Sequence, residues 1–526
     1  MKKTMKQHSF TARLKSLALV FSIAMAFTSC ANEDVAQNPT NPNEDNDKNL
    51  TTFVAGDETK TRTSMDYNSG DFYWEAGDYI YVKDDNNVWQ KSTNAPTSKV
   101  ASFKYKVPGK FTASTSYKVY YLGKNSNGSQ VKISDKQKQT APDNTEHFGE
   151  SGDYGSATAN KITGKQQFSF TLEHQPAYLI FQPYTSNTVL HDCYLTKIEV
   201  TSDNDIAETY TINTSTDNLD ASAGNKQIIL TTKSSGAYTN GFPLTNSSAS
   251  RTTNGAYMII KPGTHVLRVR YWIKDIATNV EGTITKLLPS TNYASNTYYD
   301  MTANLNVTNY DGDNYYMWDA QDQYWKGHEW NHSGSQPTLD YNLPGATTSN
   351  DYAQSNGDSR YYNEAFTHDV DNPATHASCK DLPNVNEMTW YAAKGEPRWD
   401  IDELWTTMGH LYKGGMWFKK KTYISGYNKN TAVDGIDWRT TSKTNSWLAS
   451  NTLPSAADAS KYFFLPALGF YGSEKLYITG PLGSYWSSSA NPNYGSNAYY
   501  LHFYGGIVYV FYDHRNHGFR VEPSFK

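Results

Sequence analysis

The sequence predicts a mainly β protein with an α+β part at its C-terminal end. The 526-residue chain holds 41 Tyr and 13 Trp but only 19% charged residues, a composition typical of strands and turns. Short alternating segments separated by Gly, Asn, Pro and Ser run from residue 50 to about residue 306. Helix signals appear only after residue 310. At about 150 residues per domain, this length predicts about three domains.

Charge and cysteine content exclude several classes of function. The net charge is −5 and no block is densely basic, so we expect no nucleic-acid partner. No stretch reaches the ~18 apolar residues that a membrane span needs. The three cysteines contain no C-x-x-C pair, which excludes a disulfide framework and a thiolate zinc site. Cys193 lies in an alternating segment and is expected to be a small buried residue, while its pairing with Cys379 stays open.

The first 30 residues have the pattern of an export signal. Four lysines and Arg13 precede an apolar run over 17–27 that is too short to span a bilayer. The run ends in Phe-Thr-Ser-Cys, which resembles a bacterial lipobox and implies that Cys30 carries acyl chains. An ordinary secretory signal is the alternative. Residues 31–34 are similar to the acidic tag that sends Bacteroidota lipoproteins to the outer face of the outer membrane, and 31–49 is too polar to order itself, so it is expected to be a disordered tether.

The segment 50–306 is predicted to form two β-sandwiches. Its clearest strand patterns are 79–82, 117–122, 177–181 and 265–272. A Gly-, Ser-, Asp- and Asn-rich stretch over 144–164 indicates a seam. We therefore place one domain at 50–165 and the next at 166–306.

The last part, 310–526, has a different composition. It holds ten of the 13 tryptophans. Asn384 and Glu387 predict a capping box for a helix over 384–393. Asp400 and Glu403 predict the start of a second helix, because the apolar residues that follow recur at three- and four-residue spacing. Strand patterns return over 485–488, 498–504, 507–512 and 519–521, and their short links predict hairpins.

The span "TKTRTSMDYNSGDFYWEAGDYIYV" over 59–82 resembles the opening of the fimbrillin-like (Mfa-like) family. The later segments "FTLEHQPAYLIF" and "IIKPGTHVLRVRYWI" are similar to its second half. The resemblance covers about 255 residues. It implies two transthyretin-like sandwiches that serve as subunits or accessory proteins of surface pili. In polymerising members a protease cuts after an arginine and removes the first strand, and a strand from another subunit fills the groove.

Two positions of this chain match that process. Residues 50–55 (Leu-Thr-Thr-Phe-Val-Ala) match the first strand, and Arg62 matches the arginine. Loss of the strand exposes unpaired backbone, and refilling the groove restores the ladder by donor-strand complementation. The alternative is that Arg62 is a solvated loop residue in an uncut, membrane-anchored protein.

The final ~145 residues carry a second resemblance. The segments "LPNVNEMTWYAAKGEPRWDIDELW", "YFFLPALGF", "GSYWSSSANPN" and "GFRVEP" resemble modules related to the Fibrobacter major paralogous domain, a relative of the C-type-lectin-like fold. This implies a compact α+β domain with long loops that bind a ligand. Because the chain ends inside this module at Lys526, we expect a subunit that accepts a strand without a tail to donate, as at a pilus tip.

Catalytic and metal-binding patterns are weak. His328-Glu329-Trp330-Asn331-His332 matches H-E-x-x-H, but nearby Gly and Pro disfavour the helix that this zinc motif needs, so a metallopeptidase is only an alternative. A single cysteine in the last domain excludes formylglycine-type chemistry. The acidic run at 311–314 lacks EF-hand spacing. We therefore expect no enzyme activity, no metal and no cofactor.

Aromatic residues supply the candidate ligand site. In 498–504 one face of the strand is expected to be core and the other exposed. Most tryptophans are assigned to cores, whereas the loop residues Tyr471, Tyr477 and Tyr494 are the candidate ligand-binding side chains.

The sequence thus predicts a non-catalytic surface adhesin, a pilus tip or accessory subunit. Its expected partners are other pilus subunits, a glycan or surface-protein ligand, and the outer membrane through a lipid anchor. A non-polymerising, glycan-binding outer-membrane lipoprotein is the alternative.

Overall fold

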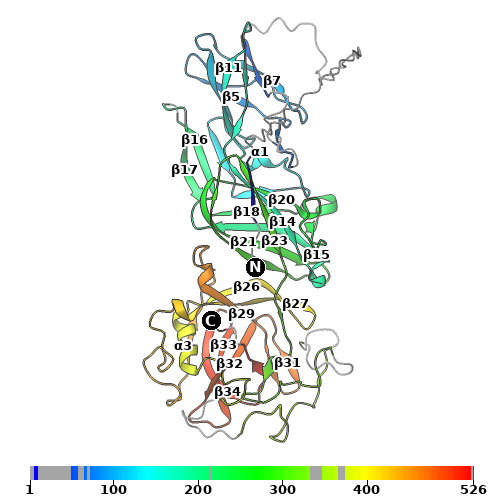
Figure 1. Cartoon of the computed structure of the whole chain (residues 1–526), viewed down its shortest axis with the longest axis vertical. Coiled ribbons are helices and arrows are strands. Elements are labelled where there is room, and N and C mark those ends of the chain that lie inside the picture. Colours follow the sequence, from blue (N-terminus) through cyan, green and yellow to red (C-terminus); the bar gives the residue numbers. More distant parts are fainter. Residues whose placement is uncertain are drawn as a thin grey trace, which may run out of the picture.

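The computed structural model describes residues 5–9, 49–56, 64–67, 72–213, 215–331, 340, 346–364, 374–522 and 525. Figure 1 shows three parts stacked along the long axis: an N-terminal sheet at the top, a central part, and a C-terminal part at the bottom. Strands dominate, and α3 (Val385–Lys394) is the only described helix longer than four residues. This confirms a mainly β fold. Within the described ranges, no helix has the length and apolarity that a bilayer crossing requires.

The N-terminal part encloses an aromatic core with one rolled sheet of order β6-β5-β8-β11-β12-β2-β7. Its ends meet where Thr93 N, just after β6, donates to Lys106 O on β7 at 2.8 Å. Phe53, Trp74 and Tyr105 lie fully buried inside. The transthyretin-like assignment of this part stays a prediction. The strands are β2 (Leu50–Ala55), β5 (Ile80–Lys83), β6 (Trp89–Lys91), β7 (Phe103–Pro108), β8 (Ser116–Tyr121), β11 (Gly155–Lys161), β12 (Gln167–Phe170) and β13 (Glu173–His174), with a small hairpin of β3 (Ser64–Met65) and β4 (Phe72–Tyr73).

The stretch 144–164, which we expected to be a seam, contains α1 (Phe148–Ser151) and the sheet strand β11. Its small residues serve packing: a Cβ at Gly155 would lie 2.6 Å from Leu172 Cγ. Strands β12 and β13, beyond residue 165, still belong to the first sheet. Conversely, β9 (Gln130–Ile133) and β10 (Lys136–Lys138) pair with strands of the central part. The chain therefore passes back and forth between the two parts.

The central part is a sandwich of two sheets. One has the order β1-β23-β14-β20, and the other begins β10-β18-β15-β21-β22. Facing side chains such as Ile180, Val200 and Ile259 form one buried core. Its elements are β1 (Met5–Ser9), β14 (Ala177–Tyr184), β15 (Cys193–Ser202), β18 (Gln227–Thr231), β19 (Phe242–Pro243), α2 (Arg251–Asn254), β20 (Ala256–Ile260), β21 (Gly263–Asp275), β22 (Glu281–Tyr293) and β23 (Thr297–Asn304), with β16 (Ala207–Ile212) and β17 (Leu219–Asn225) forming a ribbon with β9.

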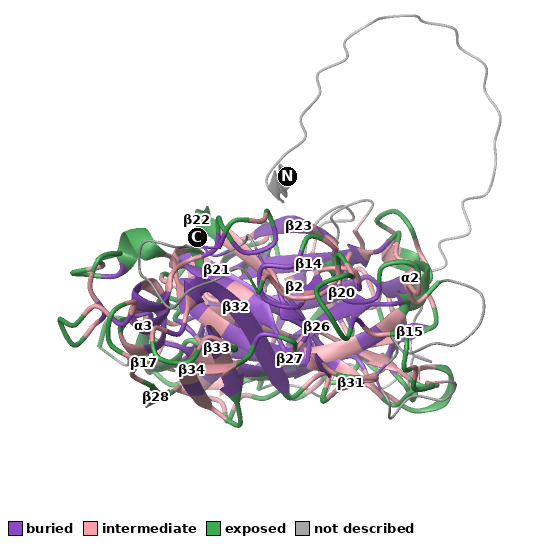
Figure 2. Cartoon of the chain, turned by 90° about the horizontal axis from the view of Figure 1, so that it is seen from below, coloured by how far each residue is buried: buried purple, intermediate pink, exposed green. Residues whose placement is uncertain are grey.

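The C-terminal part packs α3 against a six-stranded sheet of order β25-β35-β32-β33-β34-β28. The predicted capping box of α3 is confirmed, because Glu387 N donates to Asn384 Oδ1 at 3.1 Å and Asn384 N donates to Glu387 Oε2 at 2.9 Å. Figure 2 shows the central strand β32 almost wholly buried. The strands are β24 (Asn309–Tyr310), β25 (Tyr315–Tyr316), β26 (Arg398–Thr407), β27 (His410–Lys419), β28 (Asn445–Leu448), β29 (Tyr462–Pro466), β30 (Phe470–Gly472), β31 (Lys475–Tyr477), β32 (Leu482–Ala490), β33 (Asn497–Tyr504), β34 (Ile507–His514) and β35 (Phe519–Arg520).

Two local predictions in this part are wrong. The expected helix from Asp400 is the hairpin β26–β27, whose turn residues Met408 and Gly409 have φ of 47° and 73°. Two positive φ values suit a two-residue hairpin turn, and Ile401, expected on the buried face, is 58% exposed. The other error concerns β35, which pairs with β25 and β32 instead of forming a hairpin with β34.

Asp400 and Glu403 join the C-terminal part to the central part. Arg270 Nη2 lies 2.8 Å from Asp400 Oδ1, and both side chains are buried. Thr285 donates to Glu403 through Oγ1 at 2.6 Å and through its backbone N at 3.1 Å. A parallel pairing of Thr283 with Glu403 makes the sheet continuous from β22 into β26. Burial, and next the charge of Asp400, raise the pKa of Glu403 to about 7.

Candidate functional site

Strand β2 is the first strand of this sheet in the sequence, yet two other strands flank it in space. It pairs parallel to β12, from Thr52 with Gln167 to Ala55 with Phe170, and antiparallel to β7 on its other side. Gly56 N adds a last bond to Phe170 O at 3.1 Å. Removal of β2 therefore uncovers two strand edges and opens the sheet.

The inward side chains of β2 complete the core. Phe53 and Ala55 are both 0% exposed. The Phe53 ring lies 5.1 Å from the ring centroid of Phe168, stacked, and 5.1 Å from that of Phe111, edge-on. Replacing a buried Phe by Ala typically costs about 3–5 kcal/mol. A first sheet without β2 thus has an apolar furrow that an incoming strand can fill.

The chain after the predicted cut is held by the central part. Arg62 itself, like Cys30, lies outside the described residues. Just beyond it, Met65 is buried and exchanges hydrogen bonds with Thr145 Oγ1 at 2.9 and 3.0 Å. Tyr67 OH donates to Asp300 carboxylate oxygens at 2.9 and 2.8 Å, and the Arg251 guanidinium lies 3.7 Å from the Tyr67 ring centroid. The two sides of residues 57–63 are therefore anchored in different parts of the protein.

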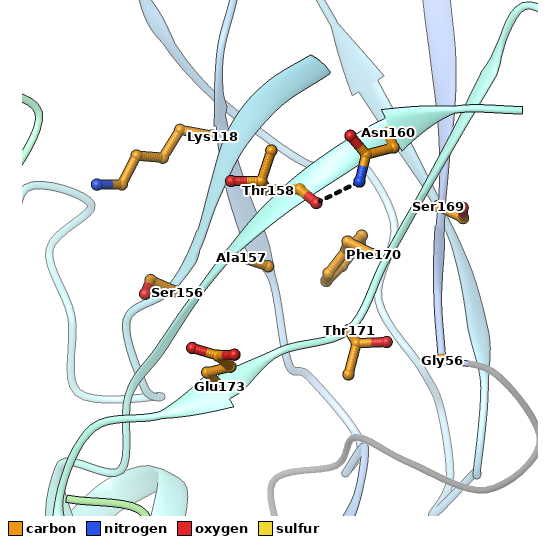
Figure 3. Close-up of a pocket in the computed structure, with 10 residues that line it drawn as sticks. All are labelled: Gly56, Lys118, Ser156, Ala157, Thr158, Asn160, Ser169, Phe170, Thr171 and Glu173. Atoms are coloured by element: carbon orange, nitrogen blue, oxygen red, sulfur yellow. Dashed lines mark hydrogen bonds between the residues drawn. The ribbon is translucent and has the colours of Figure 1, made fainter. Parts of the chain in front are cut away.

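A polar hollow of about 760 Å³ opens beside the end of β2 (Figure 3). The hollow forms at a gap in the pairing of β11 with β12 and β13. Asn160 pairs with Ser169 on β12, and Ser156 pairs with Glu173 on β13. Thr158 lies between these two pairs and has no partner residue in either ladder. Hydroxyl side chains, Lys118 and Glu173 line it. Because Gly56 is part of this lining, β2 ends at the hollow.

Two of the three predicted ligand-binding tyrosines, Tyr471 and Tyr477, lie on the β30–β31 hairpin, whereas Tyr494 lies in the loop between β32 and β33. The expectation that Tyr471 is exposed is wrong: it is 1% exposed and packs against Tyr315 and Tyr324, and burial raises its pKa. Tyr477 is half-buried and stacks on Phe470 at a centroid distance of 5.5 Å. Tyr494 is 52% exposed. These side chains do not form one site.

The C-terminal part presents a partly exposed sheet face that was not predicted from the sequence. As expected, one face of 498–504 is core, and Tyr499, Leu501 and Phe503 are fully buried. The opposite face continues across β34, because Tyr500 pairs with Phe511 and His502 with Tyr509. We call Tyr500, His502, Tyr504, Tyr509 and Phe511 the β33–β34 aromatic face. The alternation of Ile507, Tyr509 and Phe511 is the sequence signal that identifies it.

The other chemical motifs have structural roles where they are described. Residues 328–331 lie in turns, and Glu329 Oε1 accepts hydrogen bonds from Gly327 N and Gln323 Nε2, while His332 lies outside the described residues. Cys193 and Cys379 are unpaired and buried, and Cys193 is the small core residue that its strand pattern predicts. No three His, Cys, Asp or Glu side chains in the described ranges converge on a metal position.

Comparisons with known proteins give only remote similarities. No model of a known family and no curated protein matches the chain. A candidate cell adhesion protein from Bacteroides ovatus is 12% identical, with a TM-score of 0.30 over 48% of this chain and 92% of that one. The fimbrial anchor protein Mfa2 from Porphyromonas gingivalis is 11% identical, with a TM-score of 0.23 over 47% and 83%. A fimbrial protein from Bacteroides ovatus is 9% identical, with a TM-score of 0.23 over 88% and 99%. Likeness at this level carries no argument about function, which must come from the residues.

Proposed function

We propose that the protein is a non-catalytic cell-surface adhesin that assembles with fimbrial subunits by exchange of strand β2. The observation that carries the proposal is the position of β2: it lies between β12 and β7, supplies core side chains, and is followed by the segment that bears Arg62. Cutting there separates β2 from a segment that Met65 and Tyr67 hold in place. The segment after the cut stays anchored in the central part while the groove opens, and the cut also removes β1, which leaves one edge of β23 unpaired.

Refilling the groove supplies the free energy for assembly. A donor strand that places a large apolar side chain at the Phe53 position recovers about 1.5–3 kcal/mol from its burial. It also restores the backbone ladders with β7 and β12, which are otherwise left as open edges. An unfilled groove is an aggregation hazard, so cleavage and strand capture are expected to be coupled.

A tip or accessory position suits the rest of the chain. Strand β23, the last of the central part, pairs with β14 and leads into β24, which pairs with β26 of the C-terminal part. This strand is thus committed to its own protein and is not free for donation. We place the protein on the outer membrane surface through acylated Cys30 before assembly, with the C-terminal part as the ligand-binding end.

N-terminal sequencing of the surface-exposed protein tests the cut. We expect a chain that starts at Thr63, and replacement of Arg62 by Ala should abolish this product. The change Lys60→Ala, which removes a cation from the same segment, is the matched control and should leave cleavage intact. A wild-type chain that starts only at acylated Cys30 would contradict assembly and favour the anchored, non-polymerising lipoprotein.

Strand capture is tested separately with a chain that starts at residue 63 and a synthetic peptide of residues 49–56. We expect the peptide to bind, and the peptide with Phe53→Ala to bind at least about a hundredfold more weakly, as a loss of ~3 kcal/mol implies. A peptide with Thr51→Ala, whose side chain is only half-buried, should bind like the wild type. Equal binding of all three peptides would refute the groove.

A further inference from the structure

The β33–β34 aromatic face is partly exposed: Tyr504 is 52% exposed, while its other four side chains are half-buried. Rows of paired residues cross the strands: Leu448, Ile507 and Tyr504 form one row. Along β32 the same face is closed, with Trp486 fully buried. Toward β28 it opens, since Tyr504 is 52% and Leu448 82% exposed. Side chains this apolar and this exposed on one sheet face often mark a binding surface.

Four rings of the face form a continuous row. Centroid distances are 5.8 Å from Tyr500 to His502, 5.6 Å from His502 to Tyr509, and 5.4 Å from Tyr509 to Phe511. Burial lowers the pKa of His502 to about 4, so the imidazole is neutral at physiological pH, and its Nδ1 lies 3.0 Å from Ser484 Oγ. Asp513, two residues after Phe511 on β34, places a carboxylate on the same face and lies 3.4 Å from His517 Nδ1. Its negative charge acts on Tyr500 and His502 and disfavours an anionic ligand.

The size of the face decides which class of ligand it fits. From Tyr500 to Tyr504 the strand spans about 14 Å, and three strands ~4.8 Å apart are about 10 Å wide. With its neighbours Ser446, Leu448 and Ile507 the face comprises eight residues, far fewer than the roughly 20–30 per partner that a stable protein interface uses. Neutral rings with hydroxyl and imidazole edges instead suit a small ligand that has both C–H faces and hydroxyl groups.

We propose that the β33–β34 aromatic face binds a short neutral oligosaccharide, with Tyr509 at its centre. Sugar C–H faces pack on the rings of Tyr509, Tyr504 and Phe511. Sugar hydroxyls bond to the tyrosine hydroxyls and to Ser446, which lies opposite Tyr509 on β28 and is exposed. This inference rests on the proposed adhesin function and names the ligand class of its C-terminal part.

The test is an array of immobilised oligosaccharides probed with residues 30–526 carrying Cys30→Ser. Cellotriose, mannotriose, xylotriose and N-acetylchitotriose serve as neutral probes, and sialylated and sulfated trisaccharides as charged ones. We expect binding to at least one neutral probe. Tyr509→Ala and Tyr504→Ala should each raise its Kd about tenfold, because a lost ring contact of ~1.4 kcal/mol corresponds to that factor.

Two further variants keep the result interpretable. Tyr423→Ala removes a tyrosine that is 51% exposed elsewhere on the C-terminal part, close to the 52% of Tyr504, and should not change the Kd. Tyr509→Phe keeps the ring and should raise the Kd less than Tyr509→Ala does. Binding of charged probes alone, no binding to any probe, or neutral binding that Tyr509→Ala and Tyr504→Ala leave unchanged would overturn the inference. Those outcomes leave peptide capture by the β2 groove unaffected, so the two proposals fail separately.

Discussion

Replacement of Glu403 by Gln should make the protein more stable at pH 8 and leave it unchanged at pH 4. In the folded chain the pKa of Glu403 is raised from its usual 4.5 to about 7, mainly by burial. The folded chain therefore binds this proton more tightly than the unfolded chain, and the stabilisation by protonated Glu403 is lost as the pH rises from about 4.5 to about 7. Because Glu403 is half-buried and lies beside the Asp400 charge, its raised pKa corresponds to an unfolding free energy on the order of 1–3 kcal/mol. Gln carries no charge at any pH and avoids this loss.

The assay is urea unfolding of wild type and variant between pH 4 and pH 8, followed by tryptophan fluorescence. We expect the difference in unfolding free energy between them to grow, in favour of the variant, from near zero at pH 4 to about 1–3 kcal/mol at pH 8. Glu396→Gln is the matched control: this carboxylate is 48% exposed and paired with Lys419, which lowers its pKa. Its replacement should cost at most ~1 kcal/mol. A wild-type-to-variant difference that does not change with pH would refute the argument.

Three further predictions concern packing, anchoring and turn geometry. Phe53→Ala in the uncut chain should lower the unfolding free energy of the first sheet by about 3–5 kcal/mol, measured by hydrogen exchange, and a loss below ~1 kcal/mol would contradict its core role. Tyr67→Phe removes the hydrogen bonds to Asp300 and should cost about 1–3 kcal/mol, so limited proteolysis near residue 67 should be faster; unchanged rates would argue against the anchor. Gly409→Val forces a branched side chain to a φ of 73° and should lower the melting temperature of the C-terminal part, whereas an unchanged melting temperature would show that the turn tolerates it.

The sequence predicted those elements whose signals are local. The capping box fixed α3 because Asn384 and Glu387 bond to each other's backbone. The helix that we expected to begin at Asp400 is a hairpin because of tertiary contacts. Apolar residues three and four apart suit one face of a helix, but they also suit a hairpin folded at Met408 and Gly409. What decides is Arg270, 130 residues away, which pairs with Asp400.

The candidate site shows the same division. Strand β2 was predicted from the resemblance of 50–55 and Arg62 to the fimbrillin-like opening, whereas its parallel pairing with β12 depends on the whole sheet. Tyr471 was misjudged because loop position does not reveal burial: its ring fills a gap between Tyr315 and Tyr324. The aromatic face escaped notice because exposure across two strands is set by where α3 packs.

The continuous sheet from β22 into β26 has a mechanical consequence. The C-terminal part does not rotate freely about the covalent link after β23. Such a rotation would break the Thr283–Glu403 pairing and the Arg270–Asp400 ion pair. Its orientation relative to the β2 end is therefore set by the fold. A pulling force on a ligand bound at the C-terminal part is transmitted through backbone hydrogen bonds to the β2 end. Bending is therefore expected in segments outside these connected sheets.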